Sequence, residues 1–321
     1  MYFSKLKIVN ISCLFIILSF IYFLDKKTNN IKVCICTCGK EENNYVREFV
    51  EYYKKFDVDK IFIYDNNNNN GEHFEEVLLD YISKGFVEII DFRGQLKIQN
   101  NAFNHCYNRN KMNYDWFIYY DIDEFIHLYN FKSIKNYLSQ RHFNKCNIIY
   151  LNNVIHTDNN HIYYYNRPVL ERFPEIENFK SANKKYLPRY IVQDVTKMIL
   201  KGNMQNVNFT NPHYLQLDDS INCNGFGQSI TPRSIHLDRP DHKYFYYDHF
   251  YFKSSEEYLH KLNVGDVFYG EKKGYDLFRF EIYFSINEIT MKKLDYFEKL
   301  TGVNLTFFRD KEFKNRFVSK K

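Results

Sequence analysis

Three sequence signals that would point to common functions are missing from this chain of 321 residues. No Cys-x-x-Cys pair occurs among the seven cysteines, so they do not fit a zinc site. The net charge of +5 is small and dispersed, which argues against a nucleic-acid partner. No internal repeat is visible, so a repeat protein is excluded. The hydrophobic content of 45%, rich in tyrosine and phenylalanine, is typical of a globular protein.

A hydrophobic run occupies residues 8–24. Its length of about 17 residues is the lower limit for a membrane-spanning helix. No small-x-small motif follows Leu24, which favours an uncleaved signal anchor over a cleaved signal peptide. We therefore expect a cytosolic tip and a transmembrane helix in residues 1–27. Residues 28–321 would lie on the luminal (Golgi- or ER-like) or exoplasmic side of a single-pass membrane protein.

After the hydrophobic run, two asparagines begin N-glycosylation triplets, Asn208-Phe-Thr and Asn304-Leu-Thr. Such triplets are usable only on the luminal or exoplasmic side of a membrane. In a chain this rich in asparagine they also arise by chance. They agree with the expected topology without establishing it.

Strands and amphipathic helices alternate in the first half of the chain. This order predicts βαβ units and a mostly parallel sheet flanked by helices. After Tyr165 the pattern indicates irregular or antiparallel structure, until a capping box at Ser254 begins another helix. Strands are predicted at 31–37, 60–64, 86–90, 115–120 and 147–156, and helices at 44–56, 74–82, 98–112, 131–141 and 286–300.

The most informative stretch is residues 114–125, where strand formers end in Asp-Ile-Asp-Glu at 121–124. Residues two apart in a strand point to one side, so Asp121 and Asp123 can face one site. Carboxylates held there suit Mg²⁺ or Mn²⁺, which can bind a diphosphate. The alternative is a strand that ends in a polar turn. Asp65 ends another predicted strand, and ligands of open α/β sheets bind along that edge.

The cysteines at positions 34, 36 and 38 alternate along the first predicted strand and so share one face. Buried, unpaired thiols are the default for such positions. The cysteines at 106, 146 and 223 could pair, but the sequence leaves the pairing open.

Four segments, in matching order and spacing, resemble glycosyltransferases of the GT-A fold, and most closely family 92 and its family 2 relatives. The segments are Val33–Glu42, Val58–Asn66, Trp116–Phe125 and His249–Tyr258, so the resemblance covers roughly residues 31–265. It implies a hexosyltransferase-type enzyme that moves a sugar from a nucleotide-diphosphate sugar, expected to be a UDP-sugar, to a glycan or glycoprotein hydroxyl. It also implies inversion at the anomeric carbon, and Mn²⁺ or Mg²⁺ as cofactor.

The resemblance divides residues 28–321 into a nucleotide-binding half at about 31–156 and an acceptor-side half at about 157–321. Within the first half it assigns nucleoside contacts to Thr37, Lys40, Glu41 and Asp65.

The resemblance assigns Asp121 and Asp123 to the metal and the diphosphate. His249, which we expect near the end of an aromatic strand, would be a third metal ligand, although a hydrogen-bonded core histidine fits the sequence equally well. Lys253 would neutralise the departing diphosphate as a point charge.

No general base is identified by a motif. Three carboxylates of the acceptor-side half are candidates, although solvated loop aspartates would look the same: Asp218, Asp219 and Asp238. The tyrosines at 163–165 could form a sugar-stacking platform, or they could pack into the core.

Two other functions stay open. A sugar-nucleotide nucleotidyltransferase would need a glycine-rich phosphate loop after the first strand, where this chain has Cys38-Gly-Lys-Glu. A non-catalytic, anchored glycan-binding domain would not need the acidic motif at 121–124, which is intact.

Overall fold

The computed structural model describes residues 31–176, 195–232, 235–237, 239–265, 267, 270 and 274–309. The predicted anchor at 8–24 and the candidate base Asp238 lie outside these residues. Over the ranges that are described, no helix is both long enough and apolar enough to cross a membrane.

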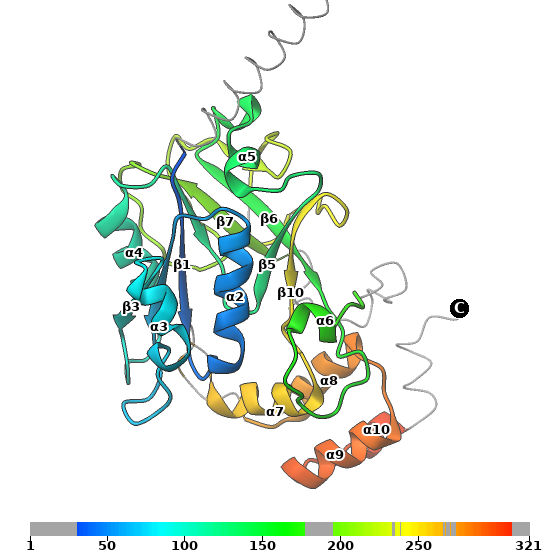
Figure 1. The fold of residues 1–321 in the computed structure, drawn as a ribbon. Coiled ribbons are helices and arrows are strands. Elements are labelled where there is room, and N and C mark those ends of the chain that lie inside the picture. Colours follow the sequence, from blue (N-terminus) through cyan, green and yellow to red (C-terminus); the bar gives the residue numbers. More distant parts are fainter. Residues whose placement is uncertain are drawn as a thin grey trace, which may run out of the picture.

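A mixed β-sheet is the centre of the fold (Figure 1). Its strands are β1 (Val33–Gly39), β2 (Lys60–Asp65), β3 (Val87–Asp91), β4 (Trp116–Tyr119), β5 (Glu124–Leu128), β6 (Ile148–Ile155), β7 (Thr196–Lys201), β8 (Asn222–Asn224), β9 (Ser229–Ile230) and β10 (Phe245–His249). The main order is β3-β2-β1-β4-β7-β6-β10-β5, with β8 on β6 and β9 on β8. Strands β1 to β4 run parallel, β7 is antiparallel to both β4 and β6, and β10 is parallel to β6 and antiparallel to β5.

Helices cover both faces of this sheet (Figure 1). They are α2 (Asn43–Lys55), α3 (Glu75–Ser83), α4 (Gln99–Asn110), α5 (Ile134–Leu138), α6 (Val169–Arg172), α7 (Ser255–Val264), α8 (Leu277–Ile286), α9 (Met291–Thr301) and α10 (Thr306–Arg309). Strand β1 shows why two layers are needed, because Val33 and Ile35 pack in the core under α2 and α3 while Cys34 and Cys36 pack in the core under α4. A strand buried on both faces belongs inside a parallel sheet.

The βαβ order of the first half is confirmed. The first four predicted strands and the three helices between them match the observed elements to within two residues at each end. The capping box is also confirmed, because Ser254 Oγ accepts from Glu257 N at 3.3 Å and Glu257 Oε2 accepts from Ser254 N at 3.0 Å.

The helix expected at 131–141 is shorter than predicted. Ser133 has an extended backbone and accepts a hydrogen bond from Asn136 N, so it caps a helix that begins only at Ile134. The helix expected at 286–300 begins at Met291, after Thr290 caps it, and α8 precedes it as a separate helix. A helix starts where a side chain satisfies its first free N–H groups, and these caps therefore shift the boundaries.

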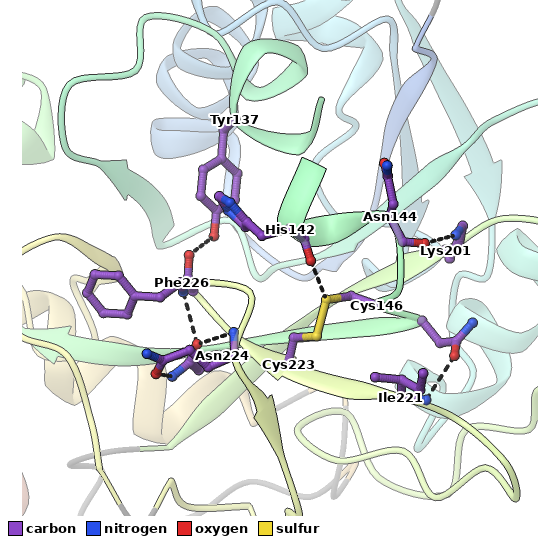
Figure 2. Close-up of a disulfide and its surroundings, with 12 residues drawn as sticks. Tyr137, His142, Asn144, Cys146, Lys201, Ile221, Cys223, Asn224 and Phe226 are labelled. Atoms are coloured by element: carbon purple, nitrogen blue, oxygen red, sulfur yellow. Dashed lines mark hydrogen bonds between the residues drawn. A yellow bond between two sulfur atoms is a disulfide. The ribbon is translucent and has the colours of Figure 1, made fainter. Parts of the chain in front are cut away.

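Two disulfides join neighbouring elements. Cys36–Cys106 links β1 to α4, and Cys146–Cys223 links the segment before β6 to β8 (Figure 2). The prediction of a buried, unpaired thiol holds for Cys34 and is wrong for Cys36. Helix α4 packs against the cysteine-bearing face of β1 and brings the Cys106 Cα to 6.3 Å from the Cys36 Cα, within disulfide range.

Candidate functional site

A cleft lies at the edge of the sheet where the parallel strands end. Strands β1, β2 and β4 finish at this edge, and so do β6 and β10, which run parallel to them. Helix α7, yellow in Figure 1, lies across the edge. The walls of the cleft come from the turn after β1 (residues 38–42), the turn at 121–123, Lys253 and one face of α7. This is the edge at which open α/β sheets bind their ligands.

The acidic motif forms a turn at this edge. Strand β4 ends at Tyr119 and β5 begins at Glu124, so the prediction that Asp121 and Asp123 share one strand face is wrong. The reversal between β4 and β5 needs these residues as its turn. Both side chains nevertheless line the cleft.

Asp121 is held by two side chains from other elements. It accepts hydrogen bonds from Lys197 Nζ at 2.7 Å and from Gln99 Nε2 at 2.7 Å. Burial alone would lower the pKa of Lys197, but Asp121 and Glu124 raise it above its ordinary value, so the ammonium stays charged. Glu124 lies 3.2 Å from the same Nζ and accepts from the Asp121 backbone N–H at 2.9 Å. This network fixes the shape of the turn.

Asp123 is buried beside a second group of cations. Its Oδ2 accepts from Lys261 Nζ at 2.7 Å, and Lys253 Nζ lies 3.9 Å away. Burial alone would raise the pKa of Asp123, but the ammonium groups of Lys261 and Lys253 lower it far below its ordinary range. Asp123 is therefore a buried carboxylate that stays ionised.

His249 ends β10 and lies opposite Glu124 in the antiparallel register. Its Nε2 is 3.7 Å from Asp123 Oδ1 and 3.9 Å from Glu124 Oε1. Burial lowers the pKa of His249 to about 3, despite the opposing charge of Asp123, so the imidazole is neutral at pH 7. Within the described part of the chain, His249 Nδ1 and Glu124 Oε1 are buried without a hydrogen-bond partner.

Asp123 and His249 fit a divalent cation in donor chemistry. A neutral imidazole nitrogen and an ionised carboxylate oxygen, 3.7 Å apart, can both ligate Mn²⁺. No group of three or more ligating side chains is preformed as a metal site in the ranges that the structure describes. Within those ranges the pair offers two ligands, and oxygens of a bound substrate or of water suit the remaining positions.

The residues predicted to contact the nucleoside divide into two groups. Lys40 and Glu41 line the cleft, and Glu41 has a positive φ of 55° in the sharp turn after β1. Thr37 lies behind this wall, fully buried, and its Oγ1 has no hydrogen-bond partner among the described residues.

Asp65 ends β2 and is buried. Its carboxylate is paired with Arg93, and its Oδ1 accepts from the Asn67 backbone N–H at 2.9 Å. Asn67 Oδ1 accepts in turn from the Glu41 backbone N–H at 2.7 Å. Asp65 thus connects the loop after β2 to the turn after β1 and supports the cleft wall.

Two lysines reach the cleft from the same side. Lys253 Nζ lies 4.1 Å from the centre of the Tyr45 ring and 3.9 Å from Glu42 Oε2. Lys261, which the sequence reasoning missed, follows Glu257 by one helical turn on the cleft-facing side of α7. The sequence could have indicated Lys261, because the capping box fixes where α7 begins and residues four apart lie on one face of a helix.

The structure does not bring Asp218 and Asp219 to the cleft. They lie in an exposed turn shortly before β8. Strand β8 pairs in parallel with the amino-terminal end of β6, where Asn222 is opposite Ile148. These carboxylates are therefore at the opposite edge of the sheet from Asp123.

Comparison with known proteins identifies the family. Residues 29–262 match the family model of glycosyltransferase family 92, which is more than half of the chain. The chain belongs to glycosyltransferase family 92.

Curated relatives match over a short segment. A family 92 protein of Oryza sativa subsp. japonica is 34% identical over 95 residues, which are 30% of this chain and 16% of the relative. One from Ricinus communis is 31% identical over 97 residues, 30% of this chain and 17% of the relative. The matched segment thus spans less than a fifth of these relatives.

Two solved structures align with part of this chain. A mannosyltransferase from Pyrobaculum calidifontis, in complex with GDP-Man and Mn²⁺, has a TM-score of 0.29 at 7% identity, over 41% of each chain. TarS of S. aureus has a TM-score of 0.27 at 12% identity, over 43% of this chain and 23% of its own.

Proposed function

We propose that this protein transfers a sugar from a nucleotide-diphosphate sugar, with a UDP-sugar as the first candidate, to a hydroxyl group of a glycan or glycoprotein. Family membership supports the reaction class. The observation that carries the proposal is the cleft at the carboxyl edge of the sheet, where a turn with two carboxylates faces Lys253 and Lys261. Such a cleft suits a diphosphate, whose oxygens accept hydrogen bonds from ammonium groups.

The chemistry we propose is a single displacement on the GT-A fold. The acceptor oxygen bonds to the anomeric carbon, the bond from that carbon to the diphosphate oxygen breaks, and the configuration inverts. The acceptor proton leaves to a general base within hydrogen-bond reach. Lys253 and Lys261 stabilise the negative charge that develops on the departing nucleoside diphosphate.

Asp123 and His249 would hold the Mn²⁺ or Mg²⁺ ion. Asp121 would contact the metal–diphosphate complex from the cation's side. A divalent cation, when bound, adds positive charge next to the leaving group. The neutral state of His249 supports this assignment, because a protonated imidazole cannot ligate. Asp121 already has Lys197 and Gln99 as partners, which supports a positioning role for it.

We also propose that the protein is a signal-anchored, single-pass membrane protein whose residues 28–321 are luminal or exoplasmic. The hydrophobic run at 8–24 supports the anchor. The two disulfides support an oxidising compartment, because disulfides persist there and are rare in the cytosol. Protease digestion of intact microsomes tests the topology, and degradation of the bulk of the chain from the cytosolic side would overturn it.

The test of the enzymatic proposal is a donor panel with purified residues 28–321. Hydrolysis and transfer of UDP-, GDP- and CMP-sugars are measured with Mn²⁺, with Mg²⁺ and with EDTA. We expect turnover of at least one UDP-sugar, and loss of that turnover in Asp123→Asn. Turnover unchanged in a folded Asp123→Asn protein would refute the site, and no turnover of any donor would refute the function.

A further inference from the structure

A second cavity lies outside the cleft, between the loop at 160–165 and helix α9. We call it the tyrosine groove, and its volume is about 970 Å³. Tyr163 is 62% exposed, Tyr165 is 40% exposed and Leu300 is 53% exposed. Large side chains left in solvent along one hollow are unusual for a surface that binds nothing.

Helix α9 presents two different faces. Leu294 and Phe297 are buried in the core formed with α7 and α8. The groove side carries residues 292, 295, 296, 299 and 300, which recur at the spacing of one helical face. The Tyr296 and Tyr163 rings pack edge to face with their centres 5.3 Å apart. The loop and the helix are therefore in contact and line a single groove. From Lys292 to Leu300 the helix rises about 12 Å, which suits a chain of sugars better than a single ring.

The groove loop is fixed to the first turn of α7. The backbone N–H groups of Ser255 and Glu256 donate to the carbonyl groups of His161 and Ile162, at 3.1 and 2.9 Å. The Tyr164 N–H donates to Glu256 Oε2 at 2.7 Å. The tyrosines are therefore carried by a loop whose backbone is already ordered, and little ordering entropy is left for a ligand to overcome.

A buried ion pair connects the groove to the cleft. Arg172 lies beneath the groove loop, with its guanidinium 5.1 Å from the Tyr164 ring and 5.5 Å from the Tyr165 ring. It donates two hydrogen bonds of 2.8 Å to Glu257, which lines the cleft and accepts from Tyr45 at 2.7 Å. The groove loop and the cleft thus both contact α7, the loop through Ser255 and Glu256 and the cleft through Glu257.

We propose that the tyrosine groove binds the oligosaccharide part of the acceptor, a proposal that rests on the proposed glycosyltransferase function. A pyranose ring has an apolar C–H face, which packs on an aromatic ring, and a polar rim of hydroxyl groups. The groove offers both kinds of contact, because its lining includes the aromatic Tyr163, Tyr165 and Tyr296 and the polar Asn160, Lys292 and Lys299. A protein partner would favour a larger continuous apolar patch than one interrupted by lysines.

The test compares the double variant Tyr163→Ala/Tyr296→Ala with Tyr129→Ala. Tyr129 is a matched control, because it is 47% exposed and follows β5, which runs antiparallel to β10 and so ends away from the cleft. Acceptors are galactan, mannan and xylan fragments of two and six sugars. For the preferred six-sugar acceptor we expect the groove variant to raise KM about tenfold, equivalent to 1.4 kcal/mol. The KM for two-sugar acceptors, the kcat, the donor KM and donor hydrolysis should stay unchanged.

Direct binding separates this proposal from the proposed function. Saturation-transfer NMR with the same six-sugar fragments, without donor, should show binding to the wild type and to Tyr129→Ala and its loss in the groove variant. If no donor is turned over but this pattern is seen, the enzymatic proposal fails and the groove proposal stands. Absence of binding by the wild type to every fragment, or equal binding and equal KM in the groove variant, would overturn the groove proposal. Binding of a protein instead of these sugars would do the same.

Discussion

Removing the charge of Glu257 should destabilise the protein strongly. Glu257 and Arg172 form a bidentate pair whose side chains are 5% and 1% exposed. Burial alone would raise the pKa of Glu257, but Arg172 and Ser254 lower it from its ordinary value of 4.5 to about 2. The ionised form of Glu257 is therefore more stable in the folded protein than in the unfolded chain, relative to the protonated form.

The size of the effect follows from that difference. The pKa of Glu257 falls from 4.5 in the unfolded chain to about 2 in the folded protein, and each pKa unit is equivalent to 1.36 kcal/mol. The ionised Glu257 therefore contributes about 3 kcal/mol to the free energy of unfolding at neutral pH. The contribution is complete above pH 4.5 and disappears as the pH falls through about 2, because the folded-state pKa is the lower one. An independent expectation is similar, since removing one partner of a buried ion pair costs about 3–5 kcal/mol.

The assay is thermal and urea unfolding of Glu257→Gln beside Glu171→Gln. Glu171 is the control, since it neighbours Arg172 in sequence and its side chain is 62% exposed. We expect Glu257→Gln to lower Tm by roughly 6–10 °C at pH 7, and the control to change it little. The gap between wild type and Glu257→Gln should narrow as the pH falls below 4.5. A Tm within 2 °C of wild type, or a gap that does not depend on pH, would refute the reasoning.

Two further perturbations test other parts of the structure. The variant Cys146→Ser/Cys223→Ser opens a loop with a sequence separation of 77. Because the unfolded chain then gains entropy, the free energy of unfolding measured in urea should fall by about 4.5 kcal/mol. Equal stability of this variant and the oxidised wild type would contradict the disulfide. Lys261→Met removes the ammonium 2.7 Å from Asp123 and should weaken UDP binding by about tenfold or more, because charge-assisted hydrogen bonds contribute about 1.5–3 kcal/mol. Calorimetry measures this against Lys84→Met, an exposed lysine on the end of α3, and equal affinities in the two variants would exclude Lys261 from the donor site.

Local sequence patterns were sufficient for the βαβ half of the fold. Elements such as β1 and α2 have clear periodicity, and each is bounded by its own turn. The aromatic strand expected to end near His249 is confirmed as β10, Phe245–His249. Its place in the sheet was not predicted, because β10 inserts between β6 and β5, which are distant in the sequence. Aromatic composition favours a strand but does not identify its partners.

The carboxylates of the site could be predicted from the sequence, whereas most of its lysines could not. The Asp-Ile-Asp-Glu motif at 121–124 marks the cleft, but its turn geometry depends on β5 pairing with β10. Lys197 and Lys261 reach Asp121 and Asp123 across 76 and 138 residues of sequence. No local pattern encodes contacts of that range, since they arise only when β7 enters the sheet beside β4 and α7 crosses its edge.

The central claim is a donor-diphosphate site between the turn at 121–123 and α7, and calorimetric titration of UDP into residues 28–321 with Mn²⁺ tests it most directly. We predict one bound UDP per chain, and affinity at least about tenfold lower in Asp123→Asn, because that variant removes a carboxylate we assign to the metal. Circular dichroism checks that the variant is folded, which matters since Asp123 is buried beside Lys261 and Lys253. Failure of the wild-type protein to bind UDP, or unchanged affinity in a folded Asp123→Asn protein, would contradict the account.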